Sequence, residues 1–104
     1  MSEEVLPMYV QVARYKLGAK SADELVPRIE QGNLPVMREV PGFVEYYALR
    51  LADNEVASVA VFHDRSGVEE AENRLADWIE QTVKEFDITP GEVSEGEVLV
   101  TAMA

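Results

Sequence analysis

The sequence predicts an α+β fold with the element order β-α-β-β-α-β and an antiparallel sheet. Two patterns carry this prediction. Segments rich in β-branched and aromatic residues indicate strands, and they alternate with two segments of helical spacing that follow serine-led capping sequences. A chain of 104 residues, 47% of them hydrophobic, is expected to fold as a single domain over residues 1–104.

The first strand is expected over residues 8–15, which follow Pro7 and precede Gly18. Ser21 and Glu24 then form a capping box, in which the serine hydroxyl accepts a backbone N–H and the glutamate reaches back to the N-cap. The first helix is therefore predicted to begin at this serine.

The first helix has an irregular pattern further along. Pro27 lies inside it, so the helix is expected to be short, kinked or capped at Asp23 instead. Gly32 and Asn33 are typical of a helix C-terminus, which predicts a stop there. Residues 34–40 are expected to add a further helical turn or two.

Residues 43–51 and 56–63 predict a β-hairpin across a short turn. If Ala52 pairs with Glu55 at this turn, the numbers of the two residues in every cross-strand pair sum to 107. A three-residue loop would instead shift one strand relative to the other. The central pairs are then Tyr47 with Ala60 and Tyr46 with Val61.

Both faces of this hairpin are largely apolar. One carries Phe43, Glu45, Tyr47, Leu49, Leu51, Val56, Ser58, Ala60 and Phe62; the other carries Val44, Tyr46, Ala48, Arg50, Ala57, Val59, Val61 and His63. Because the helices cover one face of the sheet, a second copy of the chain is expected to cover the other. Burying several hundred Å² of apolar surface per subunit, at roughly 25 cal/mol per Å², is worth on the order of 10 kcal/mol before association costs. This gain predicts a homodimer.

The second helix is predicted to begin at Ser66, which forms a second capping box with Glu69. Its apolar residues recur at three- and four-residue steps: Val68, Ala71, Leu75, Ile79, Val83 and Phe86. Any element that continues beyond Phe86 is expected to end at Pro90 and Gly91. Residues 97–101 are predicted to form the last strand.

The charge of the chain restricts its partners. The formal net charge is −11, and residues 53–104 carry 13 acidic and 3 basic side chains. Such a field disfavours nucleic acid and anionic membrane surfaces. Residues 1–4 are acidic and no apolar run approaches the length of a bilayer span, so a cytoplasmic protein without membrane contact is expected.

The element order, the Pro-Gly-Phe sequence at 41–43, the strand at 59–62 and the helical segment 73–78 resemble the antibiotic biosynthesis monooxygenase-like proteins of the dimeric α/β-barrel superfamily. The resemblance covers nearly the whole chain. It implies a ferredoxin-like protomer, a sheet-to-sheet dimer forming a dimeric α/β barrel, and a small-molecule pocket between sheet and helices. It does not select an activity, because the superfamily includes cofactor-independent oxygenases, haem-degrading enzymes and isomerases.

His63 and Asn73 are the candidate catalytic residues. His63 is the only histidine and ends the third strand, where an imidazole can act as a base; the alternative is a polar strand end. Asn73 carries an amide on the second helix, where an exposed polar position is equally consistent. One histidine and no cysteine exclude the common zinc and iron sites; a carboxylate-only magnesium or calcium site stays open, but no EF-hand spacing is present, so no metal is expected. The sequence also lacks a glycine-rich phosphate loop, so no nucleotide cofactor is expected.

Tyr15, Tyr47, Arg50 and Trp78 are the candidate ligand-binding residues, because phenols, an indole and a guanidinium suit a flat aromatic ligand. Packing in the core or the dimer is the alternative for the aromatic ones. Arg50 must pair, reach an edge or meet a ligand, and Glu45 of a second protomer is one partner to consider.

These observations lead to two main hypotheses. The first is a homodimeric monooxygenase-like protein that oxidises a small aromatic or polyketide-like compound without metal or flavin. The second is a non-catalytic small-molecule-binding or stress-associated homodimer, which the lack of a tight acid–base pair favours. A docking module that uses the acidic second half is a third hypothesis.

Overall fold

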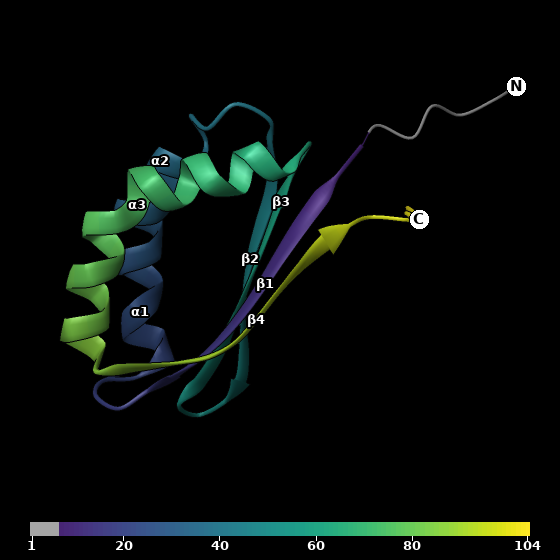
Figure 1. Ribbon diagram of the computed structural model, residues 1–104. Helices are drawn as coiled ribbons and strands as arrows, with labels where there is room; N and C mark the ends of the chain where they lie inside the picture. Colours follow the sequence, from purple (N-terminus) through teal and green to yellow (C-terminus); the bar gives the residue numbers. More distant parts are fainter. Residues whose placement is uncertain (1–6) are drawn as a thin grey trace, which may run out of the picture.

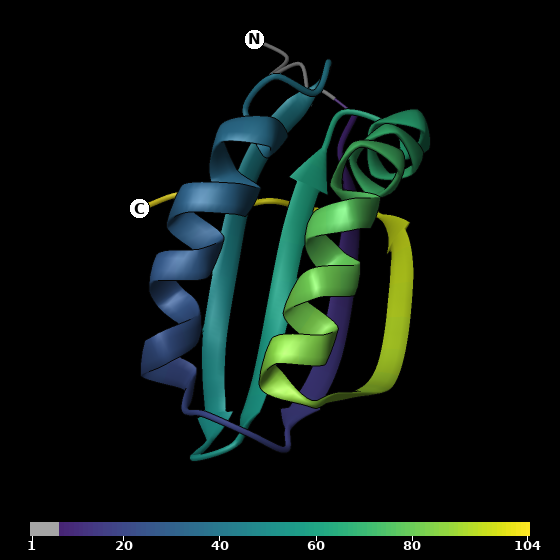
Figure 2. The same ribbon diagram turned by 90° about the vertical axis from the view of Figure 1, so that its left-hand side faces the viewer.

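The structure, a computed structural model, describes residues 7–104, so the acidic residues 1–4 lie outside the described part. Its elements are β1 (Tyr9–Leu17), α1 (Ala22–Arg28), the π-helical turn η1 (Ile29–Asn33), α2 (Leu34–Met37), β2 (Phe43–Ala52), β3 (Glu55–Phe62), α3 (Arg65–Phe86) and β4 (Ile88–Glu97). The strands form one antiparallel sheet in the order β2-β3-β1-β4. Both helical segments cover the same face of this sheet (Figures 1 and 2). The predicted ferredoxin-like α+β fold is confirmed, with an open sheet in the single chain.

The first helix begins as predicted. Ser21 is the N-cap of α1, and its hydroxyl accepts a hydrogen bond from the Glu24 N–H at 3.3 Å. The Glu24 carboxylate accepts one from the Ser21 N–H at 2.7 Å, which completes the capping box.

The predicted stop at Gly32 and Asn33 is wrong. α1, η1 and α2 follow one another without a break, and the Leu34 N–H bonds to the Ile29 carbonyl, five residues earlier. The helix therefore widens at the glycine and continues to Met37. Packing explains the continuation, because Ile29 and Met37 are both buried in the core, and tertiary contacts outweigh local helix-ending preferences.

The second helix begins two residues earlier than predicted. Asp64 rather than Ser66 is the N-cap of α3, and its carboxylate accepts a hydrogen bond from the Gly67 N–H. The Ser66 hydroxyl donates to the same carboxylate. An aspartate N-cap carries a full negative charge toward the helix N-terminus, which explains why it takes this position.

The hairpin forms, but its predicted register holds only beside the turn, at the pair Ala52 and Glu55. The pairing shifts by one residue between Arg50 and Ala52, and again near Phe43, because β2 is bulged. Tyr46 therefore lies opposite Ala60, and Tyr47 lies opposite Val59. As a result, Tyr46 shares a sheet face with Ala60, and Tyr47 shares the other face with Val59, which is the reverse of the assignment predicted from the turn.

The last strand lies earlier than predicted, since β4 spans Ile88–Glu97 and residues 98–101 are not in a strand. Pro90 and Gly91 belong to this strand instead of ending it. Both are tolerated because β4 is an edge strand, where a missing N–H costs little. A Cβ on Gly91 would lie 2.9 Å from the Arg14 carbonyl oxygen, so glycine permits the close strand approach.

The core lies between the helices and the sheet. Phe62 at the end of β3 and Phe86 at the end of α3 are its largest fully buried side chains. The opposite face, here called the open face, carries apolar residues on three strands: Val10, Val12, Tyr47, Leu49 and Val59. Tyr47 is 51% exposed and Leu49 is 45% exposed, so this face is uncovered in the single chain.

Candidate functional site

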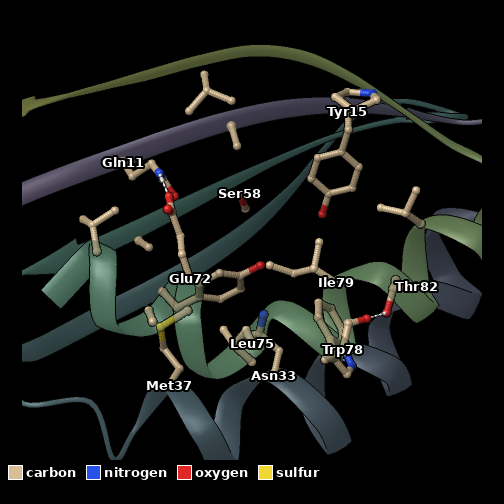
Figure 3. Close-up of a pocket in the computed structure, with 18 of the residues that line it drawn as sticks. Gln11, Tyr15, Asn33, Met37, Ser58, Glu72, Leu75, Trp78, Ile79 and Thr82 are labelled. Carbon is tan, nitrogen blue, oxygen red and sulfur yellow. Dashed lines mark hydrogen bonds between the residues drawn. The ribbon is translucent and has the colours of Figure 1, made fainter.

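A cavity of about 480 Å³ lies between the sheet and the helical layer. Its sheet side comes from β1, β2, β3 and β4, and its helical side comes from α1, η1, α2 and α3. Figure 3 shows Tyr15 extending from the sheet toward Asn33 and Trp78 on the helical side. The implied pocket between sheet and helices is thus present.

Two tyrosines form the polar part of the sheet side. Tyr15 on β1 and Tyr46 on β2 both line the cavity. Burial raises the pKa of Tyr15 to about 12. Burial also raises the pKa of Tyr46, and the nearby Tyr15 raises it further, whereas the neighbouring Ser58 hydroxyl lowers it. Both phenols are protonated at neutral pH, as an ordinary tyrosine is, and the raised pKa values extend this state to more alkaline pH; both can act as hydrogen-bond donors.

The helical side is built where α3 packs against the π turn. Trp78 on α3 lines the cavity beside Asn33 on η1. A Cβ on Gly32 would overlap the Nε1 and Cδ1 atoms of the indole, so glycine leaves the space that the ring fills. Thr82 donates its hydroxyl to the Trp78 carbonyl at 2.7 Å, one turn along α3.

Asn33 contributes an unpaired acceptor. The residue is only 6% exposed, and its Oδ1 atom is buried without a hydrogen-bond partner among the described residues. Buried polar groups are nearly always paired, so this atom is an exception among the described residues; it has almost no accessible surface and does not face the cavity.

The exposed edge of the cavity is acidic. Gln11 on β1 donates its amide to the Glu72 carboxylate at 2.8 Å and to Glu95 at 3.3 Å. Glu95 also accepts the Tyr9 hydroxyl at 2.8 Å. Glu72 lines the cavity itself, so a carboxylate stands within reach of a bound molecule.

Tyr15 and Trp78 are the sequence-predicted site residues that the structure brings together in this cavity. His63 and Asn73 are exposed and do not line it. The His63 Nδ1 atom lies 3.2 Å from the Pro7 carbonyl oxygen, just beyond β3. The two candidate catalytic residues therefore lie outside the cavity that Tyr15 and Trp78 line.

Tyr47 and Arg50 also lie outside the cavity. Tyr47 is on the open face, and its hydroxyl donates to the Glu45 carboxylate of the same chain. Arg50 reaches the α1 side of the sheet, where it pairs with Asp23. It borders a separate, smaller hollow of about 240 Å³ between α1 and the hairpin.

Asn33 is the site residue that the sequence patterns do not single out, because an asparagine after a glycine is typical of a helix stop. A signal was available: Ile29, Asn33 and Met37 repeat at four-residue steps, which places the asparagine on an apolar stripe. Gln11 and Glu72 gave no comparable signal, since single polar residues on strands and helices are usually solvent-facing.

Two further observations bear on the site. Within residues 7–104, no group of three or more histidine, cysteine or carboxylate side chains is arranged to hold a metal ion. None of the helices in the same part of the chain is long and apolar enough to cross a membrane.

Solved structures share this fold over nearly the whole chain. A protein of unknown function from Nitrosomonas europaea has a TM-score of 0.74 at 15% identity, covering 95% of this chain and 96% of its own. A candidate antibiotic biosynthesis monooxygenase from Chloroflexus aurantiacus has a TM-score of 0.70 at 16% identity, covering 93% and 97%. SnoaB, a cofactor-independent oxygenase from Streptomyces nogalater, has a TM-score of 0.64 at 17% identity, covering 92% and 95%.

No protein-family model and no curated protein matches the sequence. Each of these structural comparisons covers more than nine-tenths of this chain. The chain therefore has the fold of the antibiotic biosynthesis monooxygenase-like proteins, as the resemblance in its sequence predicts.

Proposed function

We propose that the cavity binds a small, flat aromatic compound and that the protein oxidises this compound with molecular oxygen, without metal or flavin. One observation carries the proposal: a cavity of about 480 Å³ has protonated phenols on its sheet side and an indole on its helical side. Small-molecule sites typically enclose about 300–1,000 Å³. The likeness to SnoaB, a cofactor-independent oxygenase, supports this reaction class.

The cavity tyrosines serve as donors in this proposal. Tyr15 and Tyr46 are protonated at neutral pH, and burial raises their pKa values, so that they stay protonated at alkaline pH as well. Each can donate to a ligand oxygen that gains negative charge, and such donors are most effective away from water. The Trp78 ring offers a flat apolar wall against which an aromatic ligand stacks.

Glu72 is the proposed proton acceptor, because its carboxylate borders the cavity and is held by the Gln11 amide. A phenolic ligand with an activated methylene carbon loses its phenolic proton to this group. The anion then reduces oxygen: the methylene carbon loses both hydrogens and gains one oxygen atom, and the second oxygen atom leaves with them as water. All the electrons come from the ligand, so no separate reductant is needed.

Oxygen uptake with a panel of hydroquinones and hydroxyanthrones tests the proposal, with protein-free reactions correcting for spontaneous oxidation. We expect uptake above this background, and a fall of roughly tenfold or more in Tyr15→Phe and in Glu72→Gln. His63→Ala and Asn73→Ala test the catalytic residues predicted from the sequence. A large loss of oxygen uptake in either variant would indicate that the reaction takes place outside the cavity. No uptake with any compound would contradict the oxygenase proposal.

Ligand binding without reaction is the second candidate function. The enclosed phenols keep their protons, and Glu72 stands at the exposed edge, an arrangement that suits binding as well as catalysis. Trp78 is the only tryptophan of the chain, so its fluorescence reports on the cavity directly. Fluorescence quenching by the panel without oxygen uptake would favour this function.

We also propose that the open face joins two copies of the chain into a homodimer, which would complete a dimeric α/β barrel. Support comes from Tyr47 and Leu49, large side chains that remain about half exposed beside Val59. Light scattering after size exclusion at micromolar concentration should give twice the mass of the chain. Leu49→Lys should give a monomer, whereas Val26→Lys, on the exposed side of α1, should not. A monomeric wild type would contradict the dimer.

A further inference from the structure

We infer that Asn33 recognises the ligand through its amide nitrogen: the Nδ2 group donates a hydrogen bond to a carbonyl oxygen of the ring system, so that the cavity selects aromatic ketones over hydrocarbons of the same shape. The inference rests on the proposed binding of an aromatic compound in the cavity. It concerns recognition alone, and it holds whether or not the bound compound is oxidised.

The first argument is which end of the Asn33 amide borders the cavity. Asn33 lines the cavity, and 6% of its surface is accessible. Its Oδ1 atom has almost no accessible surface, so another part of the residue makes the contact. Figure 3 shows the amide nitrogen on the cavity side, with no hydrogen bond drawn from it to the other lining residues. An amide nitrogen can only donate, so a ligand atom that pairs with it must be an acceptor.

The second argument concerns the other polar groups of the helical side. The indole nitrogen of Trp78 lies against Gly32, where a Cβ would be only 2.2 Å from it. The Thr82 hydroxyl donates to the Trp78 carbonyl at 2.7 Å. Glu72 carries an acceptor and stands at the exposed edge. The Asn33 amide is therefore the donor that the helical side offers to a ligand inside the cavity.

The third argument is the position of Asn33 in its helix. Ile29, Asn33 and Met37 are all buried and lie four residues apart, and the two flanking side chains are apolar core residues. An apolar side chain at position 33 would continue this stripe without leaving a buried oxygen unpaired. An amide kept at this cost indicates a use for its other end, and π turns are frequent at functional sites.

The fourth argument is the complementary chemistry of the sheet side. Figure 3 shows the Tyr15 hydroxyl pointing from β1 into the cavity, toward the helical side that carries Asn33. The phenols of Tyr15 and Tyr46 are protonated and can donate as well. A carbonyl oxygen has two lone pairs, so it can accept from the amide and from a phenol together. A hydrocarbon of the same shape leaves all of these donors without a partner.

A matched pair of ligands tests the inference in the wild-type protein. The probes are 9-fluorenone and fluorene, two flat molecules that differ by a carbonyl group in place of a methylene group, with binding measured by equilibrium dialysis. We expect fluorenone to bind about threefold more tightly or better, because a site with buried polar groups rejects the analogue that cannot pair with them. Equal affinities, or tighter binding of fluorene, would overturn the inference.

Asn33→Leu provides the second test, because it removes the donor and keeps a similar volume. The preference for fluorenone over fluorene should fall by about threefold to tenfold, as expected for the loss of one hydrogen bond. The variant should be at least as resistant to urea as the wild type, since the unpaired oxygen is also removed.

A purely structural asparagine would give the opposite result, with lower stability and an unchanged preference, and this outcome would overturn the inference. Gln31→Leu, on the exposed side of the same π turn, is the matched control and should retain the wild-type preference.

The outcomes separate this inference from the proposed function. A preference for fluorenone that depends on Asn33, without oxygen uptake on any compound of the panel, would support recognition by Asn33 and contradict the oxygenase. Oxygen uptake by a protein whose preference is unchanged in Asn33→Leu would do the reverse. Failure of both probes to bind would overturn the inference, and oxygen uptake with the panel would in that case still support the oxygenase.

Discussion

The indole of Trp78 lies against the backbone of Gly32, in the space that a side chain at position 32 would occupy. This contact joins α3 to the π turn η1 and brings the ring next to Asn33 on the helical side of the cavity. Position 32 is occupied by glycine because the indole leaves no room for a side chain. The helical backbone at this position does not require glycine, so backbone conformation is not the reason.

Gly32→Ala should lower the free energy of unfolding by about 1 kcal/mol. Overpacking against the indole costs about 1–3 kcal/mol, and the better helix propensity of alanine offsets about 1 kcal/mol of it. Urea denaturation measures the change. In a Trp78→Leu background the clash is absent, so the same substitution should be neutral or stabilising, and an equal cost in both backgrounds would contradict the contact.

Phe62→Ala should lower the free energy of unfolding by about 3–5 kcal/mol, the usual range for a buried phenylalanine. Phe62 is 1% exposed, and its ring packs edge-on against Phe43 with centroids 5.9 Å apart. It also touches Gly67, where a Cβ would lie 2.6 Å from the ring. Urea denaturation again provides the measurement, with Val93→Ala as an exposed control expected to change stability by less than about 0.5 kcal/mol.

The element order was predictable because each element carries its own local signal. Ser21 and Glu24 form the predicted capping box, and the apolar stripe from Val68 to Phe86 lies in one helix. The faces of β2 were not predictable, because the shift between Arg50 and Ala52 depends on packing across the sheet rather than on the turn. This one-residue shift in the pairing places Tyr46 in the cavity and Tyr47 on the open face.

The candidate site was predictable only in part for a related reason. Tyr15 and Trp78 stand out as aromatic residues on a strand and a helix, and both line the cavity. Asn33 follows a glycine, and this pair favours a helix end unless tertiary packing carries the helix onward. Its burial against the core is a property of the folded chain, and local sequence patterns do not contain it.

Alkaline pH should destabilise the protein through its cavity phenols. An unfolded tyrosine has a pKa near about 10, whereas burial raises that of Tyr15 to about 12. The folded state therefore holds the proton more tightly, so stability is fully present below about pH 10 and falls as the pH rises toward 12. Urea midpoints measured across this range should fall less steeply in Tyr15→Phe than in the wild type.

Tyrosinate absorbance offers an independent check on the same phenols. The exposed Tyr47 can ionise without unfolding, so Tyr47→Phe should remove absorbance from the folded-state titration. Tyr15→Phe should remove it only above about pH 11 or after unfolding. If Tyr15→Phe reduces the change near pH 10 in the folded protein, its phenol is not buried as described.

Acidic pH should destabilise the protein through Glu85, whose carboxylate forms salt bridges with two basic side chains, Lys20 and Arg28. Its carboxylate accepts from Arg28 Nη2 at 2.8 Å and from Lys20 Nζ at 2.7 Å, tying the end of α3 to α1 and to the turn before it. The Arg28 and Lys20 hydrogen bonds lower the pKa of Glu85 to about 2. The unfolded carboxyl has a pKa near about 4.3, so the stabilisation is present above that pH and is lost as the pH falls toward 2.

Glu85→Gln should accordingly lower the urea midpoint at neutral pH, and the gap to the wild type should close between about pH 4 and pH 2. Glu80→Gln is the matched control on the same helix, because Glu80 pairs only with Lys84 one turn away and both side chains are well exposed. An exposed pair of this kind contributes little, so its midpoint should follow the wild type at every pH. A gap for Glu85→Gln that stays constant down to about pH 2 would show that the carboxylate charge is not what the two cations stabilise.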